Sequence, residues 1–212
     1  MLSALFGCSQ QGPDASSTAA APSGADPGAA KAAAVTAAAA AHPAPAFAET
    51  APGIAIDAVP GMTLHRDFTR SYLAMDRWAV FAPPDLPGTP LAALVLDGSN
   101  EVTSAELRVG RSDDPAAIAA CLTPSAEATR PTRSVDIDGV AFTHFSASDA
   151  AMSHYVSVDS YRAVQHGRCY AIDLVVAGTQ PDVYDPPRSP PFSNDDAKQK
   201  LSASLNAVHW VD

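Results

Sequence analysis

Two histidines and one aspartate, His144, His154 and Asp159, have the side chains that a metal site or a general base requires. They could do this chemistry only if they converge in one pocket. A Ser157, His154, Asp159 triad is not expected, because strand residues 154 and 159 point to opposite faces. His144 follows the alternation of its segment, which is typical of a hydrogen-bonded strand histidine. This region therefore supports only an alternative hypothesis, that the protein is a small periplasmic hydrolase.

A second polar set pairs an arginine with a carboxylate inside predicted strands. A hairpin with a two-residue turn at His166-Gly167 places Ser160 opposite Asp173, with Arg162 diagonal to Asp173 on the same face. An arginine within a strand is costly unless it is paired. We expect an ion pair on the sheet surface, and the alternative is that Arg162 and Asp173 belong to a site that binds a carboxylate or a phosphate.

The segment 181–192 has five prolines and is bracketed by the aromatic residues Tyr184 and Phe192. Two Pro-Pro pairs favour a stiff, polyproline-like conformation. Such an arm could dock a partner through its aromatic residues. The alternative is a long connection that Tyr184 and Phe192 hold against their own domain.

Composition excludes several classes of protein. Thirteen basic residues against 23 acidic ones give a net charge of −10, which argues against nucleic-acid binding. The longest strongly apolar run of the body, Leu91 to Leu96, is too short to span a membrane. The signatures of common hydrolases, zinc proteases, NTPases and dinucleotide-binding proteins do not occur. We therefore assign no catalytic residue and expect neither a metal nor a cofactor.

The N-terminus resembles the end of a bacterial lipoprotein signal, with Leu5 and Gly7 at positions −3 and −1 before Cys8. Phe6 departs from that pattern, and no basic residue precedes the apolar stretch. The resemblance implies that residues 1–8 are a signal remnant, that Cys8 receives a lipid, and that Ser9 directs the protein to the outer membrane. Residues 9–55 contain 20 alanines among 47 residues, which is typical of a disordered tether.

Cysteine usage agrees with export. If Cys8 is acylated, Cys121 and Cys169 remain, and in an oxidising compartment they can form a disulfide. Two separate free thiols are the alternative. No C-x-x-C motif occurs, so neither a redox motif nor a zinc site is predicted.

Hydrophobic periodicity predicts a single domain over residues 56–212. An Asp138-Gly139 turn indicates one hairpin and His166-Gly167 a second. On the strand 169–177 we assign Tyr170, Ile172, Leu174 and Val176 to the core face. Helices are predicted from Ser112 to about Leu122 and from Asn194, with Leu201, Leu205 and Val208 at helical spacing. The remaining strands are predicted over 77–81, 91–96, 103–109, 133–137, 140–146 and 154–164.

This order of elements predicts an α+β domain, an antiparallel sheet with its helices packed on one face. The Trp strand before Pro83-Pro84, the Asp-Gly hairpin and the segment Gly-Arg-Cys-Tyr at 167–170 resemble small PsbP-like domains. That resemblance implies a non-enzymatic binding or assembly module and transfers no catalytic residue.

These features indicate a lipid-anchored cell-envelope protein on the periplasmic side of the outer membrane. Its domain is expected to bind an envelope protein or a ligand without catalysis. The alternatives are the small hydrolase and a structural subunit of an envelope assembly, which would carry a sizeable exposed apolar patch.

Overall fold

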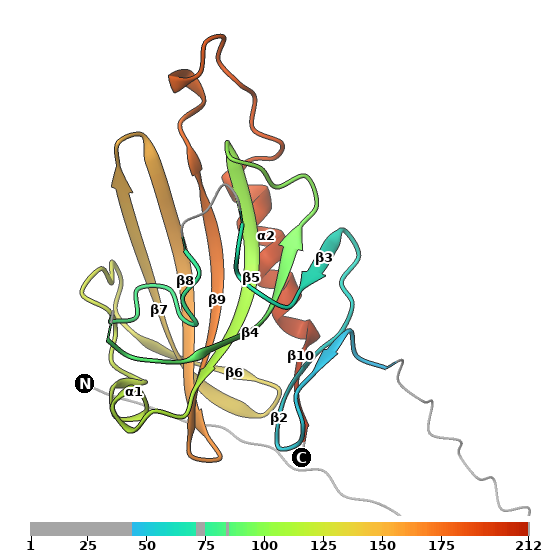
Figure 1. Ribbon diagram of the computed structural model, residues 1–212, viewed down its shortest axis with the longest axis vertical. Helices are drawn as coiled ribbons and strands as arrows, with labels where there is room; N and C mark the ends of the chain where they lie inside the picture. The colour runs from blue at the N-terminus through green and yellow to red at the C-terminus, as the bar shows by residue number, and fades with distance from the viewer. Residues whose placement is uncertain (1–43, 71–74, 84, 212) are drawn as a thin grey trace, which may run out of the picture. The chain divides into compact units, whose positions relative to one another are not determined.

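The computed structural model describes residues 44–70, 75–83 and 85–211 (Figure 1). Cys8 and residues 9–43 of the predicted tether lie outside this part of the chain. The described part contains ten strands in two antiparallel sheets and only two α-helices. No helix in it is long and apolar enough to cross a membrane.

The larger sheet has seven strands in the order β3-β4-β5-β9-β8-β7-β6. Their bounds are β3 (Met62–His65), β4 (Thr89–Leu96), β5 (Thr103–Ser112), β9 (Arg168–Thr179), β8 (His154–Gln165), β7 (Val140–Ala151) and β6 (Arg133–Ile137). Apart from the β5–β9 contact, every pair of neighbours is consecutive in the chain, because most of the sheet is built from hairpins.

Two-residue turns set the registers of the last four strands. Ile137 pairs with Val140 across Asp138-Gly139, and Gln165 pairs with Arg168 across His166-Gly167, which confirms both predicted hairpins. All four turn residues have positive φ, the conformation that suits the twist of a hairpin. Met152-Ser153 forms a third turn of the same kind without a glycine, so β7 continues to Ala151, beyond the predicted end at residue 146.

A smaller sheet closes one side of the domain, with the order β1-β2-β10 (β1, Phe47–Ala48; β2, Gly53–Ile56; β10, Val208–Val211). Phe47, Ile54 and Ile56 are buried in it. The predicted boundary at residue 55 thus falls inside β2, and the fold begins within the segment assigned to the tether. Alanine-rich composition hid these few large apolar residues.

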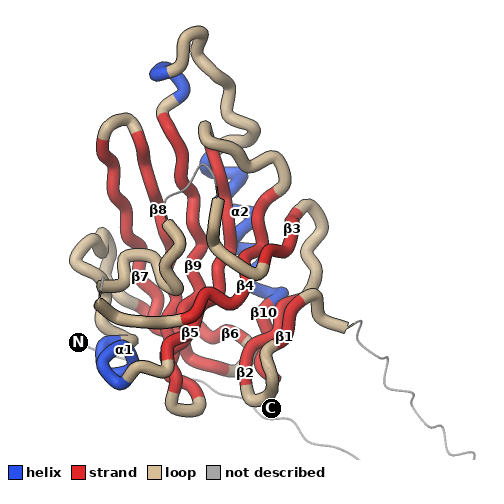
Figure 2. Tube along the Cα trace, viewed as in Figure 1, coloured by secondary structure: helices blue, strands red, loops and turns tan. Residues whose placement is uncertain are grey.

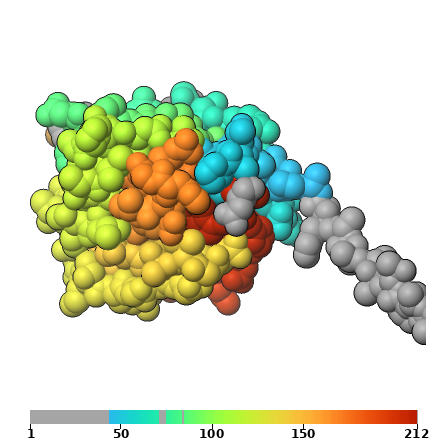
Figure 3. Space-filling model, turned by 90° about the horizontal axis from the view of Figure 1, so that it is seen from below, coloured from blue at the N-terminus to red at the C-terminus, as the bar shows by residue number. Residues whose placement is uncertain are grey.

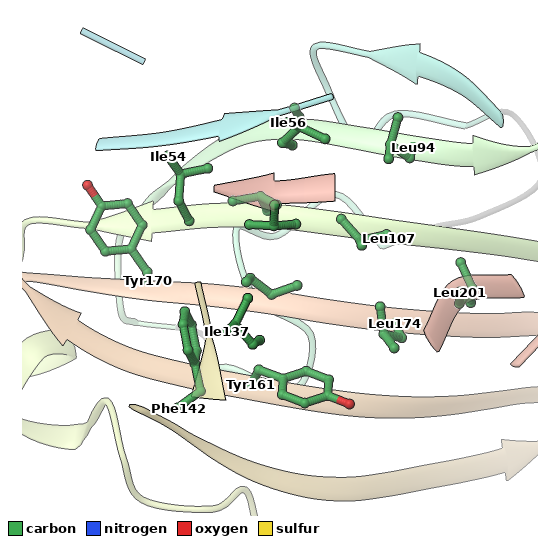
Figure 4. Close-up of a cluster of buried hydrophobic side chains, with 14 of the residues drawn as sticks. Ile54, Ile56, Leu94, Leu107, Ile137, Phe142, Tyr161, Tyr170, Leu174 and Leu201 are labelled. Atoms are coloured by element: carbon green, nitrogen blue, oxygen red, sulfur yellow. The ribbon is translucent and has the colours of Figure 1, made fainter. Parts of the chain in front are cut away.

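The main core lies between the two sheets (Figure 4). The core face of β9 is as predicted, since Tyr170, Ile172, Leu174 and Val176 all belong to this cluster. Helix α2 (Asn194–Ser204) begins after the cap Ser193, whose hydroxyl accepts from the Asp196 amide at 3.1 Å, and buries Ala197 and Leu201 against the core. The chain then makes a short turn, η2 (Leu205–Ala207), before Val208 enters β10.

The predicted α+β, PsbP-like fold with helices on one face is wrong. Helix α1 (Pro115–Ala120) packs Ala117 against Ala171 on the side of β9 that faces away from the main core, whereas α2 lies on the core side. Strands dominate the described chain, and helices are few (Figure 2). The physical reason is that β2 and β10 share with α2 the apolar face that we expected helices alone to cover.

Near the β8–β9 turn, the end of the sheet contacts one segment on each side (Figure 3). Arg168, the first residue of β9 after this turn, lies 3.0 Å from the Asp113 carboxylate, next to α1, and donates to the Pro52 carbonyl at 3.3 Å. These exposed contacts join segments far apart in the sequence.

Candidate functional site

The seven-stranded sheet has two different faces. The apolar face packs into the main core and carries Leu94, Leu107, Tyr161, Ile172 and Leu174. The opposite face, which we name the polar face, carries Glu106, Arg108, Ser160, Arg162 and Asp173. All five residues of the polar face are at most 5% exposed. Both faces of the central strands are therefore buried.

The predicted Arg162 and Asp173 pair forms on the polar face. Ser160 pairs with Asp173 in the register that the turn predicted. Arg162 Nη1 donates to Asp173 Oδ1 at 2.7 Å and Nη2 to Oδ2 at 3.3 Å, and the Ser160 hydroxyl donates to the same carboxylate at 2.7 Å. The expected surface location is wrong, because Arg162 is 5% exposed and Asp173 1%.

A strap, residues 75–83, covers this ion pair. The Val80 amide donates to Asp173 Oδ2 at 2.8 Å, and Arg162 Nη2 donates to the Val80 carbonyl at 3.3 Å. The strand predicted over 77–81 is therefore wrong. The Val80 backbone bonds to side chains instead of a neighbouring strand, and Phe81 has a φ of 58°, which reverses the chain.

Trp78 positions the strap by close contact with two glycines. A Cβ added at Gly110 would lie 1.8 Å from the Trp78 carbonyl oxygen, and one added at Gly88 would lie 2.3 Å from its indole ring. The indole Nε1 donates to the Leu86 carbonyl at 3.1 Å. The strap thus lies where the sheet surface has no side chain in its way.

A second buried charge cluster lies beside the first. Arg108 Nε donates to Glu106 Oε2 at 3.0 Å, and Arg70 Nε lies 3.4 Å from Glu106 Oε1. Arg108 Nη1 donates to the Met75 carbonyl at the start of the strap, and its guanidinium lies 5.0 Å from the centre of the Phe68 ring. Side chains of the polar face therefore bind both ends of the strap segment between Met75 and Val80.

A pocket of about 660 Å³ opens between the strap, α1 with the residues after it, and the polar face. Its walls are largely apolar, and the larger lining side chains are Met75, Trp78, Val80, Phe81, Leu86 and Phe145. Arg108 and Arg162 line it as well, and the Arg162 guanidinium lies 5.5 Å from the centre of the Phe145 ring. A concave, mostly apolar pocket with a few buried polar groups is typical of small-molecule sites.

Cys121 and Cys169 lie at disulfide-bonding distance in the wall of this pocket, with their Cα atoms 5.6 Å apart. This confirms the predicted pair. The bond fastens the segment after α1 to the start of β9. Since residues 121 and 123–127 line the pocket, the bond holds one wall against the sheet.

The histidines do not converge. His144 Nε2 lies 3.2 Å from Asp159 Oδ1, and the Ser146 hydroxyl donates to the same oxygen at 2.6 Å. Arg133 Nε donates to His144 Nδ1 at 3.0 Å, which leaves the proton of the neutral ring on Nε2. His154 instead bonds Thr179 at the other end of β8, at 3.0 Å.

Burial, together with the nearby charges of Arg133 and Arg130, lowers the pKa of His144 despite the attraction of Asp159. Within the described residues, no group of three His, Cys, Asp or Glu side chains is arranged to hold a metal ion. The hydrolase alternative needed such a convergence, so the structure lends it no geometric support.

The proline-rich segment projects beyond the sheet (Figure 1). It begins with η1 (Pro181–Val183). The Arg188 guanidinium lies 4.3 Å from the centre of the Tyr184 ring and is paired with Glu101. Phe192 packs against the main core. Phe192 therefore contacts the core of its own domain, whereas Tyr184 contacts Arg188 of the same segment.

Arg108, Glu106 and Trp78 belong to the site but were not predicted from the sequence. The signal was present, because Glu106 and Arg108 alternate with Leu107 in a predicted strand, but charges on alternate positions usually indicate a solvent face. No protein-family model matches this chain, and no curated protein matches it in sequence.

Proposed function

We propose that this protein binds a small molecule in the pocket beneath the strap, without catalysis. The observation that carries the proposal is the pocket itself. It is preformed, largely apolar and bounded on one side by a covalent bond, and it holds two buried arginines. Preformed pockets of this size and composition suit drug-sized ligands.

The domain is proposed to act in the bacterial cell envelope. Under this proposal Cys8 carries a lipid, the alanine-rich segment separates the domain from the membrane, and the protein faces the periplasm at the outer membrane. A disulfide between Cys121 and Cys169 persists most readily in such an oxidising compartment. An envelope protein that delivers or receives the ligand would be its partner.

A structural subunit would need a large exposed apolar patch. The large apolar side chains that are most exposed in the described part of the chain are Leu122, Met152, Val164 and Val183. They are four in number and belong to the residues after α1, the β7–β8 turn, β8 and η1. So few exposed large apolar side chains among the described residues favour the pocket as the functional feature.

The pocket can be tested with N-phenyl-1-naphthylamine, an uncharged aromatic probe whose fluorescence rises in apolar surroundings. Ala119 and Ala120 are both exposed residues of α1, but only Ala120 lines the pocket. Ala120→Phe should reduce probe affinity by about tenfold or more, because the added ring occupies the probe's volume. Ala119→Phe is the matched control and should bind like the native protein.

Saturable binding of one probe per chain, lost only in Ala120→Phe, would support the proposal. Absence of saturable binding, or an equal loss in both variants, would contradict it. The anchor is tested separately by Cys8→Ser in the native host. This change should move the protein from the membrane fraction to the soluble fraction, and an unchanged partition would exclude the anchor.

A further inference from the structure

The charges in the wall of the pocket are not balanced on the side that faces a ligand. Arg108 and Arg162 are the two buried charged residues among the lining residues, and their partners Glu106 and Asp173 are not part of the lining. Both carboxylates are buried against their arginines, and Asp173 also accepts from the Val80 amide. Three exposed charged residues, Asp76, Arg77 and Glu127, also line the pocket, where water screens them.

The buried charges of this face also carry a surplus. The side chains of Arg70, Arg108 and Arg162 are at most 7% exposed, and those of Glu106 and Asp173 are at most 2% exposed. Three cations thus face two anions among the described residues. Asp67 contacts Arg70 at 3.2 Å, but its side chain is 66% exposed and therefore well hydrated. A buried positive charge without a buried partner is costly, and a protein with net charge −10 has many carboxylates to place beside it.

Two buried hydrogen-bonding groups in the wall of the pocket also have no partner among the described residues. Arg108 is 1% exposed, yet its Nη2 has no hydrogen-bond partner among the described residues. The Ser125 hydroxyl, which also lines the pocket, is buried and has no partner either. Buried donors are satisfied in the great majority of native proteins, by the protein, by water or by a ligand.

We propose that the pocket binds an amphipathic organic anion, with its carboxylate or sulfonate group on Arg108 Nη2 and its apolar body between Trp78, Phe81 and Phe145. This inference rests on the proposed function and adds the chemical class of the ligand. The anion supplies the missing negative charge and accepts the free donor of Arg108. The apolar walls account for the rest of the molecule.

Two probes with the same ring system test this assignment on the full chain. N-phenyl-1-naphthylamine is neutral, and 1-anilinonaphthalene-8-sulfonate adds one sulfonate to it. The native protein should bind the sulfonate at least about tenfold more tightly, as a charge-assisted hydrogen bond to a buried arginine predicts. Both affinities are measured by calorimetric titration, which also gives the number of sites.

A pair of double variants locates the anion site. Glu106→Gln with Arg108→Met removes the proposed contact while keeping the net charge of the chain, and it should abolish the preference for the sulfonate but keep binding of the neutral probe. The control is Glu49→Gln with Arg111→Met. Arg111 belongs to the same strand β5 but points to the opposite face, where it is paired with Glu49. The control should keep the native preference, and near-ultraviolet circular dichroism checks that both variants are folded.

The outcomes separate the two proposals. If the native protein binds both probes with equal affinity, the pocket is a ligand site but the anion assignment is wrong. A preference that survives in the Glu106 and Arg108 variant would also overturn the assignment. If neither probe binds, the proposed function itself fails. A preference that disappears only in that variant supports both.

Discussion

The two faces of the seven-stranded sheet are both buried, but they are buried in different ways. The apolar face is covered by β2, β10 and α2, and its contacts are almost all between aliphatic and aromatic side chains. The polar face is covered by the strap and α1, and its central contacts are ion pairs and hydrogen bonds to the strap backbone. Both faces bury apolar side chains, since the strap also packs Val80 against Val158 and Val175, but only the polar face binds its covering segment through directional bonds.

This difference has an energetic basis. Hydrophobic contacts are not directional, so the apolar face tolerates small shifts of what covers it. A buried ion pair adds little stability compared with an apolar pair, yet losing one partner is strongly destabilising. The Arg162 and Asp173 pair also bonds to the Val80 amide and carbonyl. It therefore fixes the position of the strap through directional hydrogen bonds.

The largest expected effect on stability comes from removing one partner of the Arg162 and Asp173 ion pair. Arg162→Ala should lower the free energy of unfolding by about 3–5 kcal/mol, because it leaves the Asp173 carboxylate buried without its cation. Urea denaturation measures the loss. The paired change Arg162→Met with Asp173→Leu should recover much of it, since it leaves no unpaired charge. A loss below about 1 kcal/mol for Arg162→Ala would show that the pair is exposed to solvent.

A smaller effect is expected at the point where Trp78 crosses β5. Gly110→Ala should destabilise the protein by about 1–3 kcal/mol, because the added methyl group would overlap the Trp78 carbonyl. In a Trp210→Phe background, Trp78 is the only tryptophan, and its emission should shift to longer wavelength as the strap moves. Val109→Ala, on the apolar face of the same strand, is the comparison.

Val109→Ala should also reduce stability, because it removes buried methyl groups, but it should leave the Trp78 emission unchanged. The two variants therefore distinguish a general loss of stability from displacement of the strap. An identical emission in Gly110→Ala and the native protein would contradict the proposed close contact.

The smallest effect concerns His144 at the outer part of the apolar face. Its pKa in the folded state is lowered by burial, so the unfolded chain binds the proton more readily. This histidine should therefore reduce stability as the pH falls below about 6.5, the ordinary pKa of histidine, and have no such effect above it. Thermal melting between pH 7.5 and 5 measures the slope.

His144→Gln removes the titrating group but keeps groups that can bond Arg133 and Asp159. The variant should lose less stability on acidification than the native protein. If the native protein instead gains stability relative to the variant at low pH, the folded pKa of His144 is raised and the assignment is wrong.

Much of the sheet could be predicted from the sequence because its signals are local. The Asp138-Gly139 and His166-Gly167 turns specified two registers, and the second register correctly placed Ser160 opposite Asp173. The Met152-Ser153 turn carries no glycine, so the full length of β7 was missed. The segment around Trp78 was predicted as a strand because its apolar residues are typical of one, although the turn at Phe81 and the side-chain partners of Val80 prevent it.

The sequence by itself determined the hairpins, the core face of β9 and the cysteine pair that the structure brings together, because turn chemistry, alternation and cysteine parity are properties of neighbouring residues or of composition. Only the tertiary structure decided that the polar face is buried, that the helices lie on opposite sides, and that a pocket forms. Each of these depends on segments such as 75–83 folding over strands far away in the chain. No local sequence pattern specifies which segment will cover a sheet face. The same alternating charges can therefore lie on a solvent-exposed face or form buried ion pairs, depending on which segment packs over them.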